Sequence, residues 1–238
     1  MKLKLVKKID EARGTKSFFW EPEAKVDFLP GQYFYFTLPN LNYPDPRGAT
    51  RHFTISSSPT EGNLLQLTTR IRQESGYKKT LDELPIGVIV EGEGPNGTLY
   101  LDKNVSGTQI FVVGGIGITP FRSIIKYNID NNLKIPMYLI YSNSDSDFVF
   151  KKELDQWQKE NDYIKVSYFD SSIFGHLDKL AIEKLIENWF TPTGAKLVIG
   201  NSVLWTVGPP PFTDALENVF EKMKIPSDNI RSEKFTGY

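Results

Sequence analysis

Residues 109–120, with the sequence QIFVVGGIGITP, carry the strongest local signal for the fold. An apolar run ends in a glycine-rich stretch, and Thr119-Pro120 closes the segment. Glycine lets the backbone adopt positive φ and approach a ligand closely. Thr119 suits the position just before a helix, and Pro120 suits the first helical position. The segment therefore predicts a buried strand that turns sharply into a helix.

The start of that helix is a candidate phosphate site. Free N–H groups and the positive end of the helix dipole favour a phosphate group there. A tight strand-to-helix turn that binds nothing is the alternative. The segment also lacks the third glycine of the usual dinucleotide-binding fingerprint, so by itself it does not identify a Rossmann-type site.

Beyond about Asn104, continuous apolar runs alternate with helical patterns, which is typical of βαβ units on a parallel sheet. The helix that begins at Thr213 has apolar residues three and four positions apart and hence one apolar face. The other predicted helices cover residues 120–131 and 148–160. The predicted strands cover residues 109–113, 137–142, 164–169, 204–207 and 230–235.

The first hundred residues consist of short β-rich runs separated by turn signals such as Pro30-Gly31 and Pro95-Asn96-Gly97. The predicted strands cover residues 2–9, 15–20, 32–38, 51–57, 64–71, 88–93 and 98–101, with one short helix over 76–84. Short strands at this spacing favour a closed antiparallel barrel. We therefore expect two domains, an antiparallel β-barrel over residues 1–104 and an α/β parallel-sheet domain over residues 105–238.

The composition excludes several kinds of chemistry. The chain of 238 residues contains no cysteine. Disulfides, Cys-ligated zinc, iron–sulfur clusters and thiolate nucleophiles are therefore excluded. The two histidines, His52 and His176, cannot build a multi-histidine metal site, so we expect no bound metal. Any redox chemistry requires a bound organic cofactor.

The charge balance and the distribution of apolar residues indicate where the protein is located and which partners it does not suit. Lys and Arg number 28 against 29 Asp and Glu, a net charge of −1. This balance argues against the broad positive surface that binds nucleic acid or an anionic membrane. The N-terminus has no apolar stretch of the signal-peptide kind, and no run approaches the roughly 20 apolar residues of a membrane span. We expect a soluble, unexported, cytoplasmic protein with no membrane insertion.

Residues 51–59, RHFTISSSP, are a second segment whose side chains could bind a ligand. Arg51 offers a planar fork for a diphosphate, Phe53 a flat face, and Thr54 a hydroxyl that donates and accepts. Strand alternation places Arg51 and Phe53 on one face and His52 and Thr54 on the other. Taken alone, the segment is also explained by a strand with an exposed Arg and a core Phe.

Several segments together resemble the ferredoxin–NADP reductase-like flavoproteins, in the order in which that family carries them. They are Pro30–Tyr33, Arg51–Thr54, Gly76–Thr80, Gly114–Pro120, Gly208–Pro210 and Ile230–Tyr238. The resemblance implies an N-terminal FAD-binding barrel and a C-terminal NAD(P)-binding domain. It also implies hydride transfer between nicotinamide C4 and flavin N5.

On the flavin side, the resemblance assigns Arg51 to the FAD diphosphate, Phe53 to stacking on the flavin, and Thr54 to a hydrogen bond near N5 or O4. The family pattern is Arg-x-Tyr-Ser, so Phe53 and Thr54 are departures that keep the ring face and the hydroxyl. Lys78 and Lys79 are alternatively a solvated surface pair. The full set of FAD candidates is Arg51, His52, Phe53, Thr54, Thr69, Arg70, Ile71, Gly76, Tyr77, Lys78, Lys79 and Thr80.

On the nicotinamide side, the resemblance implies a second set of contacts. Val207 stands where the family has a cysteine, and His176 stands where many relatives have an arginine. Asp145 and Asp147 disfavour a 2′-phosphate, whereas Lys151 and Lys152 favour one, so NADH and NADPH both stay open. The candidates are Gly115, Ile116, Gly117, Thr119, Pro120, Ser142, Asn143, Gly208, Pro209 and Pro210.

The C-terminal tail resembles a segment that reaches the flavin in relatives. Glu233 is expected to organise polar contacts around N5, and Phe235 or Tyr238 to cover part of the ring. Sealing the sheet edge is the alternative for these aromatics. With Thr54, Glu233 completes the pair of residues that we expect to tune the flavin.

The sequence therefore predicts a monomeric or weakly associating FAD-dependent NAD(P)H oxidoreductase, in which the cofactors carry the hard chemistry. Electrons would leave to a ferredoxin, a flavodoxin, a partner subunit or a small oxidant. The alternative is a non-catalytic flavin- or nucleotide-binding sensor or electron-transfer subunit. A hydrolase that uses Ser56–Ser58 with His52 is excluded by the lack of a Gly-x-Ser-x-Gly elbow.

Overall fold

The computed structural model describes residues 1–102, 107–190, 199 and 201–236. The chain divides into two compact units. One comprises Met1–Asp102 together with Thr119–Tyr127, and the other comprises the described residues of Lys103–Ile118 and Asn128–Thr236. The expected domain boundary between residues 104 and 105 lies outside the described residues.

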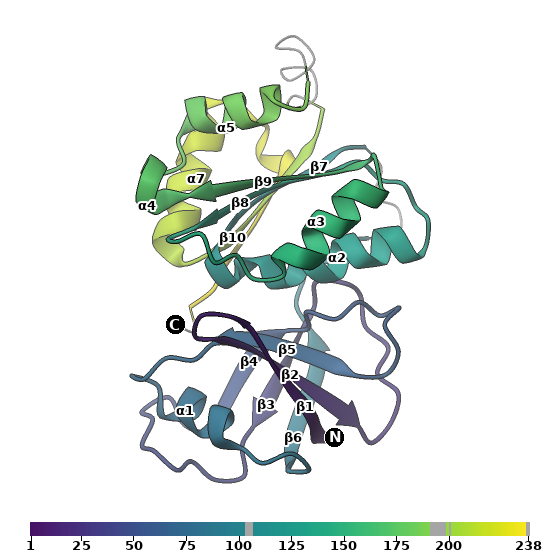
Figure 1. Ribbon diagram of the computed structural model, residues 1–238, viewed down its shortest axis with the longest axis vertical. Coiled ribbons are helices and arrows are strands. Elements are labelled where there is room, and N and C mark those ends of the chain that lie inside the picture. The colour runs from purple at the N-terminus through teal and green to yellow at the C-terminus, as the bar shows by residue number, and fades with distance from the viewer. Residues whose placement is uncertain (103–106, 191–198, 200, 237–238) are drawn as a thin grey trace. The chain divides into compact units, whose positions relative to one another are not determined.

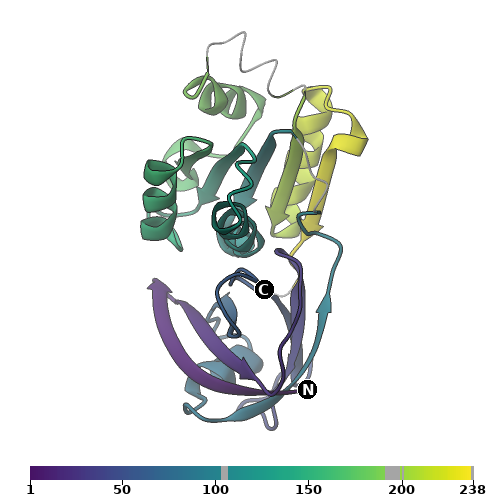
Figure 2. The same cartoon turned by 90° about the vertical axis from the view of Figure 1, so that its right-hand side faces the viewer.

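The first unit is built on a six-stranded antiparallel sheet with the order β4-β3-β6-β1-β2-β5. A bridge between Ile55 and Leu67 links the two ends of the sheet, and Ser56 N donates to Gln66 O at 2.7 Å. Figure 2 shows these strands curving around the interior of the unit. The strands are β1 Lys2–Ala12, β2 Thr15–Pro22, β3 Tyr33–Thr37, β4 Thr50–Thr54, β5 Leu65–Arg70 and β6 Ile89–Asn96.

The barrel core consists of the inward-facing residues of this sheet and the helix α1, Gly76–Glu83. Phe34 and Phe36 of β3 are fully buried, whereas Tyr33 and Tyr35 alternate outward. Tyr77 of α1 enters the core and donates from its hydroxyl to Phe36 O at 3.0 Å. A fully buried phenol usually finds such a partner.

One predicted strand of the barrel, residues 98–101, is wrong, because no strand forms there. Leu99 and Leu101 are buried, but in a loop whose Leu101 N donates to Pro30 O at 3.2 Å. The apolar alternation that predicted a strand therefore reflects burial of two loop side chains rather than sheet pairing.

The second unit is built on a five-stranded parallel sheet with the order β11-β10-β7-β8-β9 (Figure 1). Apolar side chains of α5 and α7, such as Ile182, Ile186, Leu216 and Phe220, cover the sheet face that carries Ile110. On the opposite face Trp205 packs edge-on against Phe111. The strands are β7 Gln109–Gly114, β8 Met137–Asn143, β9 Ile164–Asp170, β10 Val203–Gly208 and β11 Ile230–Lys234.

The helices of this half of the sequence differ in part from the prediction. α2 begins at Thr119, directly after a 3-10 turn η1 over Gly115–Ile118, so Thr119 is the first helical residue rather than a cap. α3 begins at Lys151 rather than at 148, because Phe150 has a left-handed φ of 63°. The helices are α2 Thr119–Asp130, α3 Lys151–Glu160, α4 Ser171–Phe174, α5 Lys179–Glu187 and α7 Pro210–Lys222.

The sequence analysis missed α4 and α5. The signal for α5 was present in the residues themselves. Asp178 caps the helix by accepting from Ala181 N at 2.8 Å, and Ile182 and Ile186 recur four positions apart with both side chains fully buried. An acidic N-cap before such a spacing is an ordinary helix start.

The glycine-rich turn after β7 leads to a prediction about stability. A Cβ at Gly117 would collide with the carbonyl oxygen of Val207, which is fixed in β10. Gly117→Ala should therefore lower the free energy of unfolding by about 1–3 kcal/mol, the usual cost of overpacking. Urea unfolding of the two proteins measures it.

Gly114→Ala is the matched control in the same turn. The nearest atoms to its Cβ would be those of the Phe212 side chain, at 3.0 Å, and a side chain moves at a lower energetic cost than backbone. The destabilisation should be smaller than for Gly117→Ala, and the reverse order would contradict the proposed role of the Val207 carbonyl.

Candidate functional site

The glycine turn lies where β7 ends at the carboxyl edge of the parallel sheet. Gly115 adopts a left-handed φ of 55°, which favours glycine. Gly114 and Gly208 lie against the ring of Phe212, and Gly117 lies against the Val207 carbonyl. The sequence analysis explained these glycines by close approach to a ligand. In the structure, packing of the turn against the β10 backbone already requires glycine at position 117.

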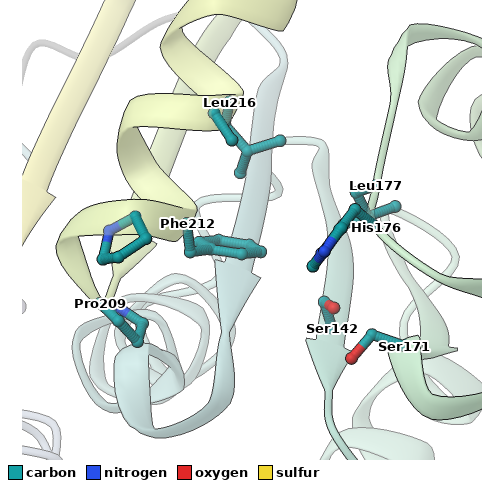
Figure 3. A pocket seen from close by; sticks show the side chains of 9 residues that line it. Ser142, Ser171, His176, Leu177, Pro209, Phe212 and Leu216 are labelled. Atoms are coloured by element: carbon teal, nitrogen blue, oxygen red, sulfur yellow. The ribbon is translucent and has the colours of Figure 1, made fainter.

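A cavity of about 430 Å³ opens at the same edge of the sheet (Figure 3). Volumes of this order are usual for small-molecule sites. Its apolar walls include Phe212 and Leu216 of α7 together with Leu177, and Figure 3 shows the Phe212 ring and His176 lying across the cavity from each other. The described lining residues are Ser142, Ser171, His176, Leu177, Pro209, Pro211, Phe212, Ala215 and Leu216.

The polar groups of this cavity come from the ends of successive strands. Ser142 belongs to β8, and Ser171, directly after β9, donates from its hydroxyl to Asn143 O at 3.0 Å. Of the nucleotide candidates, Ser142 and Pro209 line the cavity, whereas Asn143 does not and donates instead to Asp145 Oδ1 at 2.8 Å. Sequence reasoning did not assign Ser171 or Phe212 to the site, although Ser171 directly follows β9 and Phe212 lies in the first turn of α7, just after β10.

Arg51 of β4 is buried and held by a carboxylate that the sequence analysis did not single out. Its Nη2 forms a 2.5 Å ion pair with Asp45 Oδ1, and its Nη1 donates to the carbonyls of Arg47, Gly48 and Thr50 at 2.7–3.0 Å. The Arg51 guanidinium also lies over the ring of Tyr77 at 5.2 Å. The Asp45-Pro46-Arg47-Gly48 turn, whose Gly48 has a positive φ of 73°, was the available signal.

Asp45 also organises the start of α1. Its Oδ2 accepts from Tyr77 N and from the Ser75 hydroxyl, both at 2.9 Å. Burial alone would raise the pKa of Asp45. The hydrogen bonds from Tyr77, Arg47 and Ser75 and the charge of Arg51 outweigh burial and lower that pKa to about 2. One ionised carboxylate therefore links the β3–β4 loop, β4 and α1.

The side chains around this point are strongly cationic. Lys78 of α1 is buried, which contradicts the alternative that placed it among solvated surface residues. Burial, followed by repulsion from Arg72, Arg47, Arg51 and Arg70, lowers the pKa of Lys78 to about 8. Burial is the larger cause of this depressed pKa, and the repulsion from the four arginines adds a positive local potential, which favours an anion.

The remaining candidates of the α1 segment have structural partners. The Thr80 hydroxyl donates to Gly76 O at 2.8 Å and accepts from Asn42 N at 3.0 Å. A Cβ at Gly76 would collide with the carbonyl oxygens of Tyr43 and Pro44. The Lys79 ammonium lies 3.7 Å from the ring centroid of Tyr43. These contacts fix the loop between β3 and β4 against the start of α1.

β4 separates its side chains as alternation predicts. Phe53 is half-buried toward the core, with ring contacts to Phe36 and Tyr77 at 6.1 and 5.9 Å. His52 is exposed on the other face, between the rings of Tyr33 and Tyr35. Burial and, to a smaller extent, the charge of Arg47 lower the pKa of His52. The sequence alone does not predict the aromatic surface of Tyr33, Tyr35 and His52, because that surface requires the β3–β4 pairing.

Thr54 ends β4 opposite Tyr33 and is only 7% exposed. Among the described residues, no hydrogen bond is formed by its hydroxyl. Thr69, Arg70 and Ile71 lie at the end of β5 and just beyond it, where Ile71 N donates to Gly14 O at 2.7 Å. Thr69 is buried, and Arg70 adds to the positive charge around Lys78.

The C-terminal candidates belong to the second unit. Glu233 of β11 pairs with Val207 of β10, and burial raises the pKa of the Glu233 carboxyl group. Phe235 N donates to Gly208 O at 2.9 Å, which extends the strand contact beyond β11. The predicted contact of Tyr238 lies outside the described residues.

Two family models match the chain, one after the other. The oxidoreductase FAD-binding domain matches residues 2–100, and the oxidoreductase NAD-binding domain matches residues 111–217. The first match covers the barrel strands and α1. The second begins within β7, and it extends over the strand ends that line the cavity.

Curated relatives are similar to nearly the whole chain. Flavohemoprotein A from Dictyostelium discoideum is 25% identical over 96% of this chain and 58% of its own length. The 2-halobenzoate 1,2-dioxygenase electron transfer component from Burkholderia cepacia is 28% identical over 90% of this chain and 61% of its own length. The chain thus spans about three fifths of the length of these relatives.

A solved structure shares the fold at low identity. Ferredoxin-NADP+ reductase from Plasmodium falciparum superposes with a TM-score of 0.75 at 19% identity, covering 98% of this chain and 95% of that one. At this identity the likeness concerns the fold alone.

Within the described parts of the chain, every helix is too short or too polar to cross a membrane.

The buried Asp45 carboxylate leads to a prediction about acid stability. Its pKa in the folded chain, about 2, lies below its ordinary value of 3.8. Ionised Asp45 therefore stabilises the folded state fully above about pH 4, and this contribution is lost as the pH falls towards 2. Asp45→Asn should flatten this part of the pH dependence, as measured by urea unfolding between about pH 2 and pH 6.

Asp27→Asn is the control, because Asp27 is exposed and forms a surface ion pair with Lys25. Its pH profile should follow that of the unmodified chain. A profile of Asp45→Asn that coincides with the unmodified one would show that Asp45 does not stabilise the fold through its charge.

Proposed function

Because this chain belongs to the ferredoxin–NADP reductase-like family of FAD- and NAD(P)-binding oxidoreductases, we propose that it is a flavin-dependent NAD(P)H oxidoreductase. It transfers a hydride between a nicotinamide and a flavin and exchanges electrons with a separate acceptor. The cationic cluster around Arg51 and Lys78 is the observation that carries this proposal. It fits the diphosphate of FAD, which is the group expected at the start of α1.

The fit to FAD rests on charge. Burial lowers the pKa of Lys78, and the charges of Arg72, Arg47, Arg51 and Arg70 lower it further, while Asp45 pairs directly with Arg51. A diphosphate would relieve the mutual repulsion of the remaining cations. In this assignment Asp45 fixes the guanidinium orientation of Arg51, while Lys78 and the neighbouring arginines supply the attraction.

The flavin ring would lie near Phe53 and Thr54. Bound FAD supplies the electron-accepting ring that no side chain of this chain provides. The Thr54 hydroxyl is nearly buried and has no hydrogen-bond partner among the described residues, so it is suited to bonding a polar edge of the ring. The buried Glu233, with its raised pKa, is the second residue that we propose to act near that edge.

The nicotinamide dinucleotide would bind at the carboxyl edge of the parallel sheet, as ligands of open α/β sheets do. The Phe212 ring provides a flat apolar wall for a base, and the Ser142 and Ser171 hydroxyls suit a ribose. Gly115, Gly117, Thr119 and Pro120 would approach the diphosphate and the nicotinamide. The proposed domains are residues 1–104 for FAD and residues 105–238 for NAD(P).

We favour NADH over NADPH. None of the described residues that line the cavity is a lysine or an arginine, and His176 stands where the family resemblance implies a phosphate-binding arginine. The adjoining β8 loop is acidic, with Asp145 bonded to Asn143 and to Asp147 N. A 2′-phosphate would meet this negative charge without a guanidinium to offset it.

The electron acceptor is proposed to be a separate carrier protein, such as a ferredoxin or flavodoxin, or a partner subunit. The chain has no cysteine and thus no ligands of its own for an iron–sulfur cluster. Similarity to proteins named as dioxygenase electron transfer components supports this class of acceptor.

The proposed function is tested by mixing the FAD-loaded chain with NADH or NADPH without oxygen and following the flavin absorbance. NADH should bleach the flavin band, and NADPH should do so at least about ten-fold less efficiently, a discrimination of about 1.4 kcal/mol. His176→Arg should make flavin reduction by NADPH more efficient and so lower the NADH-to-NADPH ratio. Ala215→Ser is the control: it also changes the cavity wall but adds no charge, and it should leave this ratio unchanged.

A chain that cannot be loaded with FAD would refute the proposal. A loaded chain whose flavin ignores both nicotinamides would favour the non-catalytic alternative. Faster reduction by NADPH than by NADH would overturn the coenzyme assignment alone.

A second prediction concerns the pH dependence of FAD binding. Since Lys78 has a pKa of about 8 in the ligand-free chain, a diphosphate should bind best at a pH at which Lys78 is charged. FAD affinity should be constant below about pH 7 and fall about three- to ten-fold by pH 9 as the free chain loses this proton. Calorimetric titration with FAD measures it.

Lys78→Met should bind FAD more weakly at pH 7 and show much less change by pH 9. Lys4→Met, which removes an exposed lysine of β1, is the control and should keep the unmodified pH profile. An unmodified profile in Lys78→Met would show that Lys78 does not respond to the diphosphate.

A further inference from the structure

The first nine residues of α2 belong to the barrel unit rather than to the unit that contains the parallel sheet. Thr119 and Pro120, two of the proposed nucleotide contacts, lie in this part of the helix and are buried. Arg122 and Ser123 follow directly and are buried as well. The beginning of the nucleotide-binding helix is thus held by barrel residues.

The main contact is a two-pronged ion pair between Arg122 of α2 and Glu61 of the β4–β5 loop. Arg122 Nη1 lies 2.8 Å from Glu61 Oε2, and Nη2 lies 3.1 Å from Oε1. The Arg122 side chain is 5% exposed and that of Glu61 is 24% exposed. Two parallel bonds of this kind fix orientation as well as distance, which a lysine ammonium cannot do.

Two further bonds attach the same helix turn to the loop backbone. Arg122 Nη1 donates to Ser56 O at 2.8 Å, and the Ser123 hydroxyl donates to Ser57 O at 2.7 Å. Both bonds are buried. Ser56 lies two residues after Thr54, so the attachment point is adjacent in sequence to the proposed flavin contact.

The loop itself is held firmly enough to serve as an anchor. Ser58 N donates to Glu61 Oε2 at 2.6 Å, which orients the carboxylate toward Arg122. Ser56 N bonds Gln66 O, and the Ser57 hydroxyl bonds Leu64 O at 3.1 Å and accepts from Gln66 N. The loop is therefore tied to β5 on one side and to α2 on the other.

Such an ion pair is not explained by stability alone. Removing two side-chain charges from water is costly, and replacing a buried pair by apolar side chains is often neutral or stabilising. What an apolar contact cannot supply is a fixed direction. Hydride transfer needs that kind of fixation, because reacting atoms must come within about 3–3.5 Å with their orbitals aligned.

We propose that Arg122 and Glu61 are positioning residues that fix the start of α2, with Thr119 and Pro120, relative to Thr54 and thereby set the geometry of hydride transfer. This proposal rests on the proposed function. Neither residue touches the reacting atoms. They act through the helix start and the strand end that they join.

The test compares Glu61→Gln and Arg122→Lys with the unmodified FAD-loaded chain in rapid mixing with NADH. The limiting rate of flavin reduction should fall roughly ten- to hundred-fold, as expected for a misplacement of about 1 Å. The dissociation constants of FAD and NADH should change less than about three-fold, because the cofactor-binding groups remain. Arg122→Lys, which keeps the charge, should retain more of the rate than Arg122→Gln.

Amide hydrogen exchange provides a readout that does not depend on turnover. In Glu61→Gln, exchange should become faster in residues 119–127 and in the 56–61 loop, and stay unchanged elsewhere in the barrel. Asp82→Asn is the matched control, because Lys16 and Asp82 form a 2.6 Å ion pair between distant segments of the same unit. It should alter neither the reduction rate nor the exchange of α2.

An unmodified reduction rate in Glu61→Gln would overturn the positioning role. A loss of FAD affinity in parallel with the rate would overturn it too, since the pair would then support the barrel as a whole. If neither nicotinamide reduces the unmodified protein, the proposed function fails instead, and the exchange measurement still decides whether the pair holds α2 on the loop.

Discussion

A buried guanidinium requires a partner, and Asp45 of the β3–β4 loop meets that requirement for Arg51 of β4. An unpaired charge in this position would be strongly destabilising. The Asp45 carboxylate pairs with Arg51 and at the same time accepts from Tyr77 N and the Ser75 hydroxyl. The β3–β4 loop, β4 and α1 are therefore arranged around one carboxylate. The cationic cluster that we assign to the FAD diphosphate is a consequence of that arrangement.

The glycine turn illustrates how packing and binding can require the same residue type. Gly117 has no room for a Cβ because of the Val207 carbonyl, and Gly114 and Gly208 leave space for the Phe212 ring. Phe212 in turn forms a wall of the cavity at the sheet edge. Glycines that the motif associates with ligand binding therefore also shape the cavity wall, because they let the Phe212 ring lie close to the backbone.

The first turns of α2 carry Thr119 and Pro120, which we propose as nucleotide contacts, and they belong to the same unit as Thr54, which we propose as a flavin contact. The helix that starts at the glycine turn is continuous with the parallel sheet in sequence, yet its first turns are bonded to the loop that follows Thr54. Directional bonds between a helix turn and a strand–loop fix relative position more narrowly than apolar packing does. A reaction that depends on the distance between two bound rings benefits from that restriction.

The sequence by itself determined the two architectures, because periodicity is a local property. Period-two runs gave six of the barrel strands, and apolar runs followed by helical patterns gave the parallel sheet. It also determined the family, since Arg51–Thr54 and Gly114–Pro120 occur in the order of the family's segments. It failed at residues 98–101, where alternating leucines are buried without a sheet neighbour, and it missed α5, whose signal was present but short.

Only the tertiary structure decided which side chains meet. Asp45 and Arg51, Glu61 and Arg122, and Ser142 and Phe212 are separated along the chain, and no local pattern links the members of each pair. For Lys78, the sequence left both a contact with the FAD diphosphate and a solvated surface position possible, and only the structure shows that it is buried. Charges, cavities and directional bonds depend on distances in space, and those distances are set by how the strands pair and how the loops return, which propensity and periodicity do not encode.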